Sequence, residues 1–115
     1  MLWGPLMAAL IHAGPLLHYR SDRFLLRPIK VLATAYCLTG TTAIGWPVGK
    51  GIVATDPLDI PLGSVLVVPG YGAAIAADTG AWIKGHHIDL WMASCTGADR
   101  WGARTVMASV MGRPR

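Results

Sequence analysis

The chain has 115 residues, of which 53% are hydrophobic and 14% are charged. This composition excludes intrinsic disorder and suits one compact domain. The net charge of +4 comes mostly from the first 30 residues, where four basic residues against one aspartate give +3. The remaining 85 residues are almost neutral, so we expect no nucleic-acid-binding face.

The N-terminal stretch, residues 1–19, has no formally charged side chain and is rich in Leu, Ala and Met. Its length suits the core of a signal peptide or a marginal membrane span, although Pro5 and Pro15 interrupt it and no basic residue precedes it. We therefore expect residues 1–30 to form a leader with a basic flank, either a truncated signal or a weak membrane anchor, and residues 31–115 to form the domain.

The domain begins with a series of short apolar runs separated by Gly, Pro and other turn residues. The predicted strands are, in chain order, residues 31–36, 51–55, 64–69, 73–78, 87–91 and 105–111. The helix candidates are a single turn at residues 57–60 and a short helix at residues 96–101, capped by Thr96. A mainly β chain with one or two short helices predicts a small closed barrel, because closure removes exposed strand edges.

Two cysteines, Cys37 and Cys95, are far apart in the sequence, and neither belongs to a zinc-binding pattern. We therefore expect no metal site, and no cofactor motif is present. A disulfide between the two cysteines would fit an oxidising compartment, whereas two separate buried thiols would fit the sequence equally well.

The acidic residues are six aspartates and no glutamate, so any carboxylate chemistry must come from aspartate. Three of them lie in Thr55-Asp56-Pro57, Ala77-Asp78-Thr79-Gly80 and Ile88-Asp89-Leu90. The flanking motifs, in order, are Thr34-Ala35-Tyr36, Ile60-Pro61-Leu62-Gly63, Val68-Pro69-Gly70-Tyr71-Gly72 and Trp101-Gly102. Over residues 31–111 this ordered set resembles the 3D domain family, named for three aspartates, which occurs in cell-wall-active proteins and is similar to the catalytic domain of membrane-bound lytic transglycosylase A.

The resemblance implies a six-stranded double-psi β-barrel whose three aspartates converge near one groove. It also implies cleavage of the MurNAc-GlcNAc bond of peptidoglycan without water, leaving 1,6-anhydro-MurNAc ends. The expected partner is therefore the peptidoglycan glycan strand. The expected location is the cell envelope, periplasmic or secreted, and we expect a monomer.

Carried onto this chain, the resemblance makes Asp89 the catalytic acid and base. One such residue is sufficient, because the 6-hydroxyl of the substrate itself attacks the anomeric carbon and returns a proton. If Asp78 and Asp89 lie close together, their repulsion raises one pKa, which would keep Asp89 protonated while Asp78 stays charged. Asp56 is expected to support both by hydrogen bonding.

Six further residues are candidates for substrate binding or for orienting the aspartates: Thr34, Tyr36, Thr42, Thr79, Trp82 and Lys84. Trp82 is expected to stack on a sugar. Lys84 could hold Asp78 in its charged form, bind a carboxylate of the peptide stem, or be a surface lysine at a turn. Ala81 would be strained if its position required a positive φ. His86 and His87 would point to opposite faces of a strand, which argues against a shared metal site. We interpret both as surface residues.

Two alternatives remain open at this stage. Asp78-Thr79-Gly80 is also the local motif of a retroviral-type aspartic protease, in which Asp78 from each of two subunits would share a proton. A non-catalytic barrel that binds glycan would fit the same sequence without any reaction.

Overall fold

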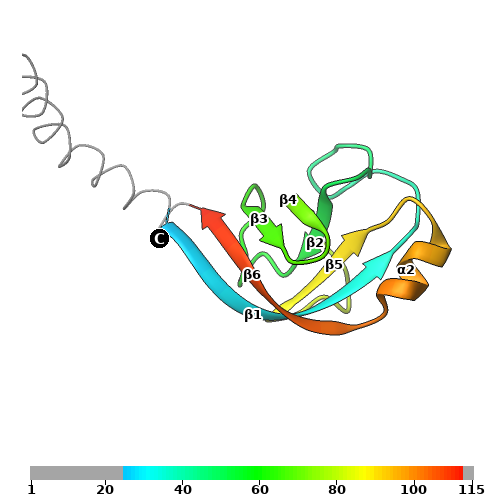
Figure 1. Cartoon of the computed structure of the whole chain (residues 1–115). Coiled ribbons are helices and arrows are strands. Elements are labelled where there is room, and N and C mark those ends of the chain that lie inside the picture. The colour runs from blue at the N-terminus through cyan, green and yellow to red at the C-terminus, as the bar shows by residue number, and fades with distance from the viewer. Residues whose placement is uncertain (1–24, 113–115) are drawn as a thin grey trace, which may run out of the picture.

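The computed structural model describes residues 25–112, which form a closed six-stranded β-barrel with one short helix (Figure 1). The elements are β1 (Leu25–Tyr36), β2 (Ile52–Thr55), β3 (Val65–Val68), β4 (Gly72–Asp78), β5 (His87–Trp91), α2 (Cys95–Trp101) and β6 (Arg104–Gly112). Within these residues, no helix has the length and apolar character needed to cross a membrane.

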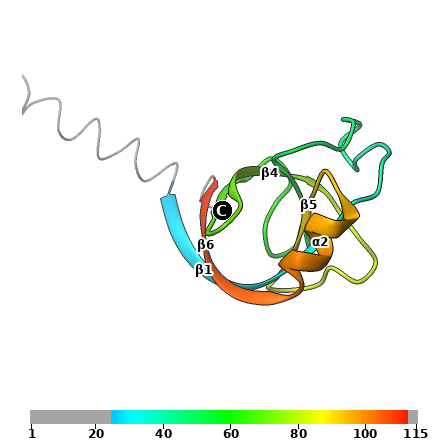
Figure 2. The same cartoon turned by 45° about the vertical axis from the view of Figure 1, so that its right-hand side comes forward.

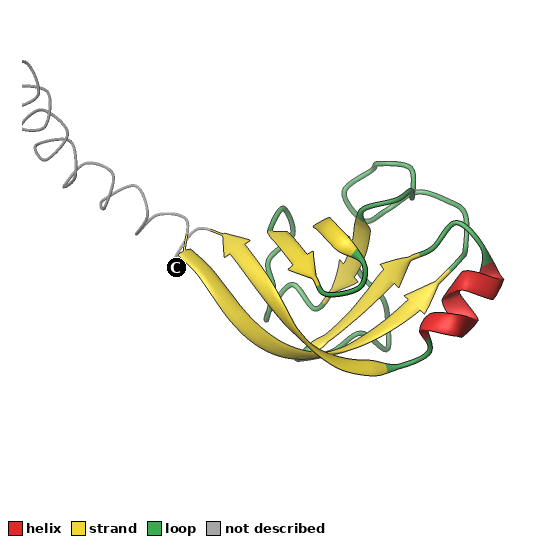
Figure 3. Cartoon of the chain, viewed as in Figure 1, coloured by secondary structure: helices red, strands yellow, loops and turns green. Residues whose placement is uncertain are grey.

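The strand order around the barrel is β1-β5-β2-β4-β3-β6, and β6 closes the barrel by pairing with β1. Two pairs are parallel, β1 with β5 and β2 with β4, and the other pairs are antiparallel. In Figures 1 and 3, β1 and β6 form a long curved pair that runs beneath the shorter strands, and Figure 2 shows the rounded cross-section of the barrel. The predicted double-psi β-barrel is confirmed.

All six predicted strands are present, but the predicted start of the first was wrong. β1 begins at Leu25, six residues earlier than expected, because its first half pairs with β6 in the register Leu25↔Gly112 to Lys30↔Met107. The predicted leader, residues 1–30, therefore overlaps β1. Residues 1–24, with the predicted signal or anchor, lie outside the described residues.

Alternate side chains of the strands form the core, because successive residues of a strand point to opposite faces. The buried core residues from the strands are Val31, Ala33, Val53, Leu66, Val68, Ala74, Ala76, Ile88, Leu90, Ala108 and Val110. Asp89 lies between two of these, Ile88 and Leu90, and therefore faces away from the core. The outer face of the same strands is thus available for a polar site.

The helix α2 packs against one end of the barrel, and its Trp101 is buried. The indole Nε1 of Trp101 donates a hydrogen bond to the Ala33 carbonyl at 2.9 Å, which joins the helix to β1. The N-cap is Ser94, whose hydroxyl accepts from the Gly97 amide at 3.0 Å, so the prediction of Thr96 as the cap was wrong. Ser94 has the extended backbone that an N-cap requires.

A disulfide joins Cys37 to Cys95, with their Cα atoms 5.1 Å apart. Of the two alternatives left by the sequence, the structure therefore has the bonded pair. Cys37 follows the last residue of β1 and Cys95 is the first residue of α2, so the bond fixes the helix to the end of β1. The other predicted helical segment, residues 57–60, is a single turn in which the Ile60 amide donates to the Asp56 carbonyl at 2.8 Å.

Candidate functional site

A row of four residues crosses four neighbouring strands on the outer face of the barrel. The members, in spatial order, are Thr34 on β1, Asp89 on β5, Ala54 on β2 and Asp78 on β4. Residues opposite one another on adjacent strands share a face, and adjacent strands lie about 4.8 Å apart. The two aspartates therefore flank Ala54 on either side, and the methyl side chain of Ala54 leaves space between them.

A β-bulge turns Asp78 toward this row. Val53 pairs with Ala76, but the next residue, Ala54, pairs with Asp78, so Ala77 is an extra residue on β4. Ala76 is buried in the core, and by simple alternation Asp78, two residues on, would face the core as well. The extra residue reverses the alternation, which brings Asp78 to the same face as Asp89.

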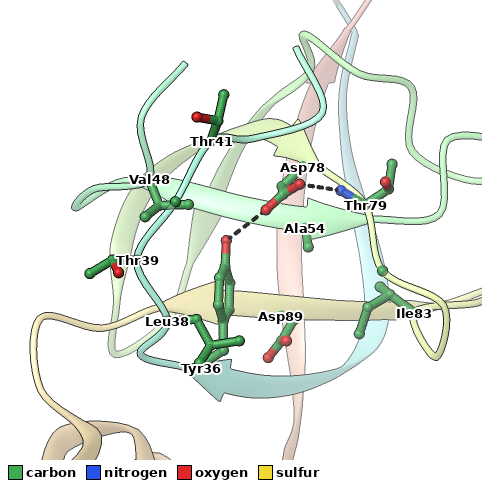
Figure 4. A pocket seen from close by; sticks show the side chains of 12 residues that line it. Tyr36, Leu38, Thr39, Thr41, Val48, Ala54, Asp78, Thr79, Ile83 and Asp89 are labelled. Atoms are coloured by element: carbon green, nitrogen blue, oxygen red, sulfur yellow. Dashed lines mark hydrogen bonds between the residues drawn. The ribbon is translucent and has the colours of Figure 1, made fainter. Parts of the chain in front are cut away.

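Both aspartates line one pocket of about 290 Å³ (Figure 4). This volume is close to the lower end of the range for small-molecule sites, roughly 300–1,000 Å³. Of the predicted substrate-binding residues, Tyr36 and Thr79 also line it. The segment between β1 and β2 forms a further wall through Leu38, Thr39, Gly40, Thr41 and Val48. The pocket is therefore built from strands on one side and a long loop on the other.

Asp78 accepts hydrogen bonds at both carboxylate oxygens. Its Oδ1 accepts from the backbone amides of Thr79 at 2.9 Å and Ala43 at 3.1 Å. Its Oδ2 accepts from the Tyr36 hydroxyl at 3.3 Å, and Figure 4 shows these two side chains pointing toward each other. Burial, followed by the charge and hydrogen bond of Asp78, raises the pKa of Tyr36, so the hydroxyl stays protonated as a donor. An ionised carboxylate has acceptor positions for all three donors.

Asp89 has a different environment. It is partly buried, and its Oδ1 accepts from the Thr34 hydroxyl at 2.9 Å. Burial raises the pKa of Asp89 because it disfavours the charged form, while the Thr34 hydrogen bond and the His87 charge oppose this effect. The charge of Asp78 adds a smaller increase. The direction is the one predicted, but burial, rather than repulsion between the two aspartates, is the main cause.

His87 contacts this network, although the sequence led us to interpret it as a surface residue. Its Nε2 lies 2.9 Å from the Thr34 hydroxyl, and its Nδ1 lies 3.2 Å from the Trp82 carbonyl oxygen. The two histidines do point in opposite directions, since His86 contacts Asp59 at 3.3 Å instead. His87 is two residues before Asp89 on the same strand, and that spacing alone could have placed it on the face of the site.

Asp56 does not line the pocket. Its Oδ2 accepts from the Gly85 amide at 2.8 Å and its Oδ1 from the Leu58 amide at 3.1 Å. These two bonds, with a smaller contribution from the charge of Lys84, lower the pKa of Asp56. The expected hydrogen bonds from Asp56 to the other two aspartates are therefore not the ones it makes. It instead joins the turn after β2 to the loop that leads into β5.

The other predicted site residues lie outside the pocket. Lys84 is exposed, and its charge contributes to lowering the pKa of Asp56. Thr42 is buried and accepts from the Trp46 amide at 3.0 Å, so it fixes the loop between β1 and β2. Trp82 is 89% exposed. The condition for strain at Ala81 is not met, because no non-glycine residue among those described has a positive φ.

The residues that the structure describes contain no group of three or more His, Cys, Asp or Glu side chains placed to hold a metal ion. The site therefore consists of two carboxyl groups that have unlike hydrogen-bond partners and face a common pocket. Such a pair can perform proton transfer at one member while the other supplies negative charge.

A family model described as 3D domain matches residues 51–111. Similar proteins include the cell wall-binding protein YocH of Bacillus subtilis strain 168, which is 43% identical over 94 residues that cover 74% of this chain and 33% of YocH. The putative cell wall shaping protein YabE of the same organism is 44% identical over 78 residues, covering 68% of this chain and 19% of YabE. The chain thus spans a third or less of the length of these relatives.

Among solved structures, MltA from E. coli matches 65% of this chain and 28% of its own, with a TM-score of 0.53 and 24% identity. A structure of E. coli MltA with bound chitohexaose matches 68% of this chain and 29% of its own, with a TM-score of 0.54 and 21% identity. At these identities the likeness establishes a shared fold.

Proposed function

The chain belongs to the 3D domain family, and on that premise we propose that it is a lytic transglycosylase domain acting on peptidoglycan glycan strands. It would cleave the MurNAc-GlcNAc bond and leave 1,6-anhydro-MurNAc ends. The observation that carries this proposal is the pairing of two aspartates with unlike surroundings in one pocket. Asp89 has a raised pKa, while Asp78 receives three hydrogen bonds that suit a carboxylate.

In the proposed reaction Asp89 first acts as the acid. It donates its proton to the glycosidic oxygen as the bond from that oxygen to C1 of MurNAc breaks. The 6-hydroxyl of the same MurNAc attacks C1, and its proton passes to Asp89, which acts now as the base. One bond breaks and one forms, Asp89 ends in its starting state, and water takes no part. Asp78 supplies negative charge near the positive charge that develops on the sugar.

The remaining site residues take supporting roles in this proposal. Tyr36 and Thr79 hold Asp78 and offer polar groups to a bound sugar. Asp56 fixes Gly85, which has a φ of 66° and lies two residues before His87, so it positions the start of β5 rather than the substrate. Asp56 is therefore a supporting residue one step removed from the reaction.

The cell envelope is the proposed location. The printed names of YocH and YabE, a cell wall-binding and a putative cell wall shaping protein, support association with the wall. The Cys37–Cys95 disulfide supports an oxidising compartment outside the cytosol. A periplasmic or secreted protein would meet both conditions.

A non-catalytic wall-binding module is the second candidate, and the name of YocH favours it, because that relative is called a binding protein. The protease alternative has no such support. Both oxygens of Asp78 accept hydrogen bonds from the same chain, and family membership does not favour a dimer that shares Asp78.

The test is to incubate the protein with purified peptidoglycan and to analyse the soluble fragments by mass spectrometry. Anhydro ends support the proposal, whereas reducing ends would indicate hydrolysis. Sedimentation with the wall without any released fragment would favour the binding module. Asp99→Asn is the matched control for Asp89→Asn, because Asp99 is exposed on α2 and lies outside the pocket.

A further inference from the structure

The hydrogen bonds around His87 restrict where its protons can lie. The Trp82 carbonyl oxygen, 3.2 Å from Nδ1, can only accept a hydrogen bond. Nδ1 must therefore carry a proton for this contact to be a hydrogen bond. Nε2, 2.9 Å from the Thr34 hydroxyl, is then an acceptor when the imidazole is neutral and a donor when it is charged.

The Thr34 hydroxyl has one proton and lies 2.9 Å from both His87 Nε2 and Asp89 Oδ1. Two arrangements satisfy both contacts with the Thr34 proton lying between His87 and Asp89. In the first, charged His87 donates to Thr34, and Thr34 donates to the Asp89 carboxylate. In the second, protonated Asp89 donates to Thr34, and Thr34 donates to neutral His87. The two arrangements contain the same number of protons and differ only in which bonds the protons occupy. The Ile88 carbonyl oxygen, 3.3 Å from the Thr34 hydroxyl, can take the Thr34 proton instead when His87 and Asp89 are both protonated, a state with one proton more.

Resting on the proposed function, we propose that His87 is a positioning residue that acts through the Thr34 hydroxyl to control the proton of Asp89. Neutral His87 accepts from Thr34, and this leaves the Thr34 oxygen to accept from protonated Asp89, the form ready to act as an acid. After Asp89 gives its proton to the leaving oxygen, the Thr34 hydroxyl turns to donate to the new carboxylate. The proton from the 6-hydroxyl then restores the starting arrangement.

The other charged and titratable groups around Asp89 cannot take this role. From β4, Asp78 faces the pocket with Asp89, and its charge disfavours the Asp89 carboxylate. From β1, the Tyr36 hydroxyl donates its hydrogen bond to Asp78, and from β2 the residue paired with Asp89 is Ala54, which has no charge. Of the two groups whose charges act on Asp89, His87 is the one that can carry a positive charge.

The experiment is a carbon-detected NMR titration of the Asp89 carboxyl group in the full chain, with the His87 imidazole followed in parallel. In the unchanged protein we expect the Asp89 signal to titrate in two steps, one of which coincides with the titration of His87, because coupled groups share their proton loss. In His87→Gln the shared step should disappear, and the remaining midpoint should rise by about one pH unit, since a neighbouring cation is lost.

The matched control is His86→Gln, in which the adjacent histidine, on the opposite face, is replaced. This variant should leave both steps of Asp89 in place. Thr34→Val removes the hydroxyl while keeping both titrating groups, so replacing His87 in that background should move the Asp89 midpoint less than half as far. The idea is overturned if Asp89 titrates in one step in the unchanged protein, a measurement that needs no variant to fold, or if the Thr34→Val background shows the full shift.

These titrations require no substrate, so they separate this inference from the proposed function. Coupled titration without any anhydro product would refute the reaction and leave the link between His87 and Asp89 standing. Anhydro product with uncoupled titration would overturn the link alone. If both hold, the alkaline limb of the pH–rate profile should move to higher pH in His87→Gln, because Asp89 would keep its proton longer, and should stay in place in His86→Gln.

Discussion

Removing the disulfide should lower the free energy of unfolding by about 4 kcal/mol. The bond joins residues separated by 58 positions, and closing a loop of that length in the unfolded chain costs about this much on the chain-entropy model. For a domain of this size, 1 kcal/mol corresponds to roughly 3–5 °C in Tm, so the loss should be about 12–20 °C. The Cys37→Ala, Cys95→Ala double variant makes the change without leaving free thiols.

The measurement is thermal unfolding followed by circular dichroism, with the unchanged protein under oxidising and reducing conditions beside the double variant. The chain has only these two cysteines, so a reducing agent acts on this bond alone. The reduced protein and the double variant should unfold at similar temperatures, well below the oxidised protein. A difference of less than about 3 °C would refute the reasoning, since the loop would then contribute little to the entropy of the unfolded chain.

Three further predictions concern the site. Asp89→Asn should stabilise the protein at neutral pH, as measured by urea unfolding. Because the pKa of Asp89 is raised in the folded state, the stability of the unchanged protein falls as pH rises from the ordinary aspartate pKa through the folded-state pKa. The extra stability of the variant should therefore vanish at pH values below the ordinary aspartate pKa. Tyr36→Phe removes the donor to Asp78 and should slow anhydro-product formation about fivefold, from the roughly 1 kcal/mol of one hydrogen bond; an unchanged rate would exclude this role. Ala54→Leu should fill the space between the aspartates, and both the formation of soluble anhydro fragments and binding to the wall should be lost. The circular dichroism spectrum should stay unchanged, which shows that the variant is folded.

The barrel could be predicted because its strands are short apolar runs that end at Gly, Pro or Asp, and local pattern defines such segments well. The β5 prediction, residues 87–91, matched the structure at both ends. The start of β1 was wrong, because residues 25–30 contain a proline and two basic residues, and only their pairing with β6 makes them a strand. Strand pairing over that distance leaves no mark in a local pattern.

The site could be predicted only in part, because its geometry depends on register. Nothing local in the sequence of β4 reveals the extra residue Ala77, without which Asp78 would face the core. Asp56 was grouped with the other aspartates by its motif, but its carboxylate binds the backbone of Leu58 and Gly85. His87 was missed because adjacent histidines resemble a surface pair, although the two-residue spacing from Asp89 carried the information.

The most direct test of the proposed reaction is cleavage of purified peptidoglycan in water enriched in heavy oxygen, followed by mass spectrometry of the new sugar ends, for the unchanged protein, Asp89→Asn and Asp99→Asn. The account predicts anhydro ends that carry no heavy oxygen from the unchanged protein and from Asp99→Asn, and loss of cleavage by about a hundredfold or more in Asp89→Asn, as for removal of a general acid. Heavy oxygen in the new ends, or full cleavage by Asp89→Asn, would contradict it.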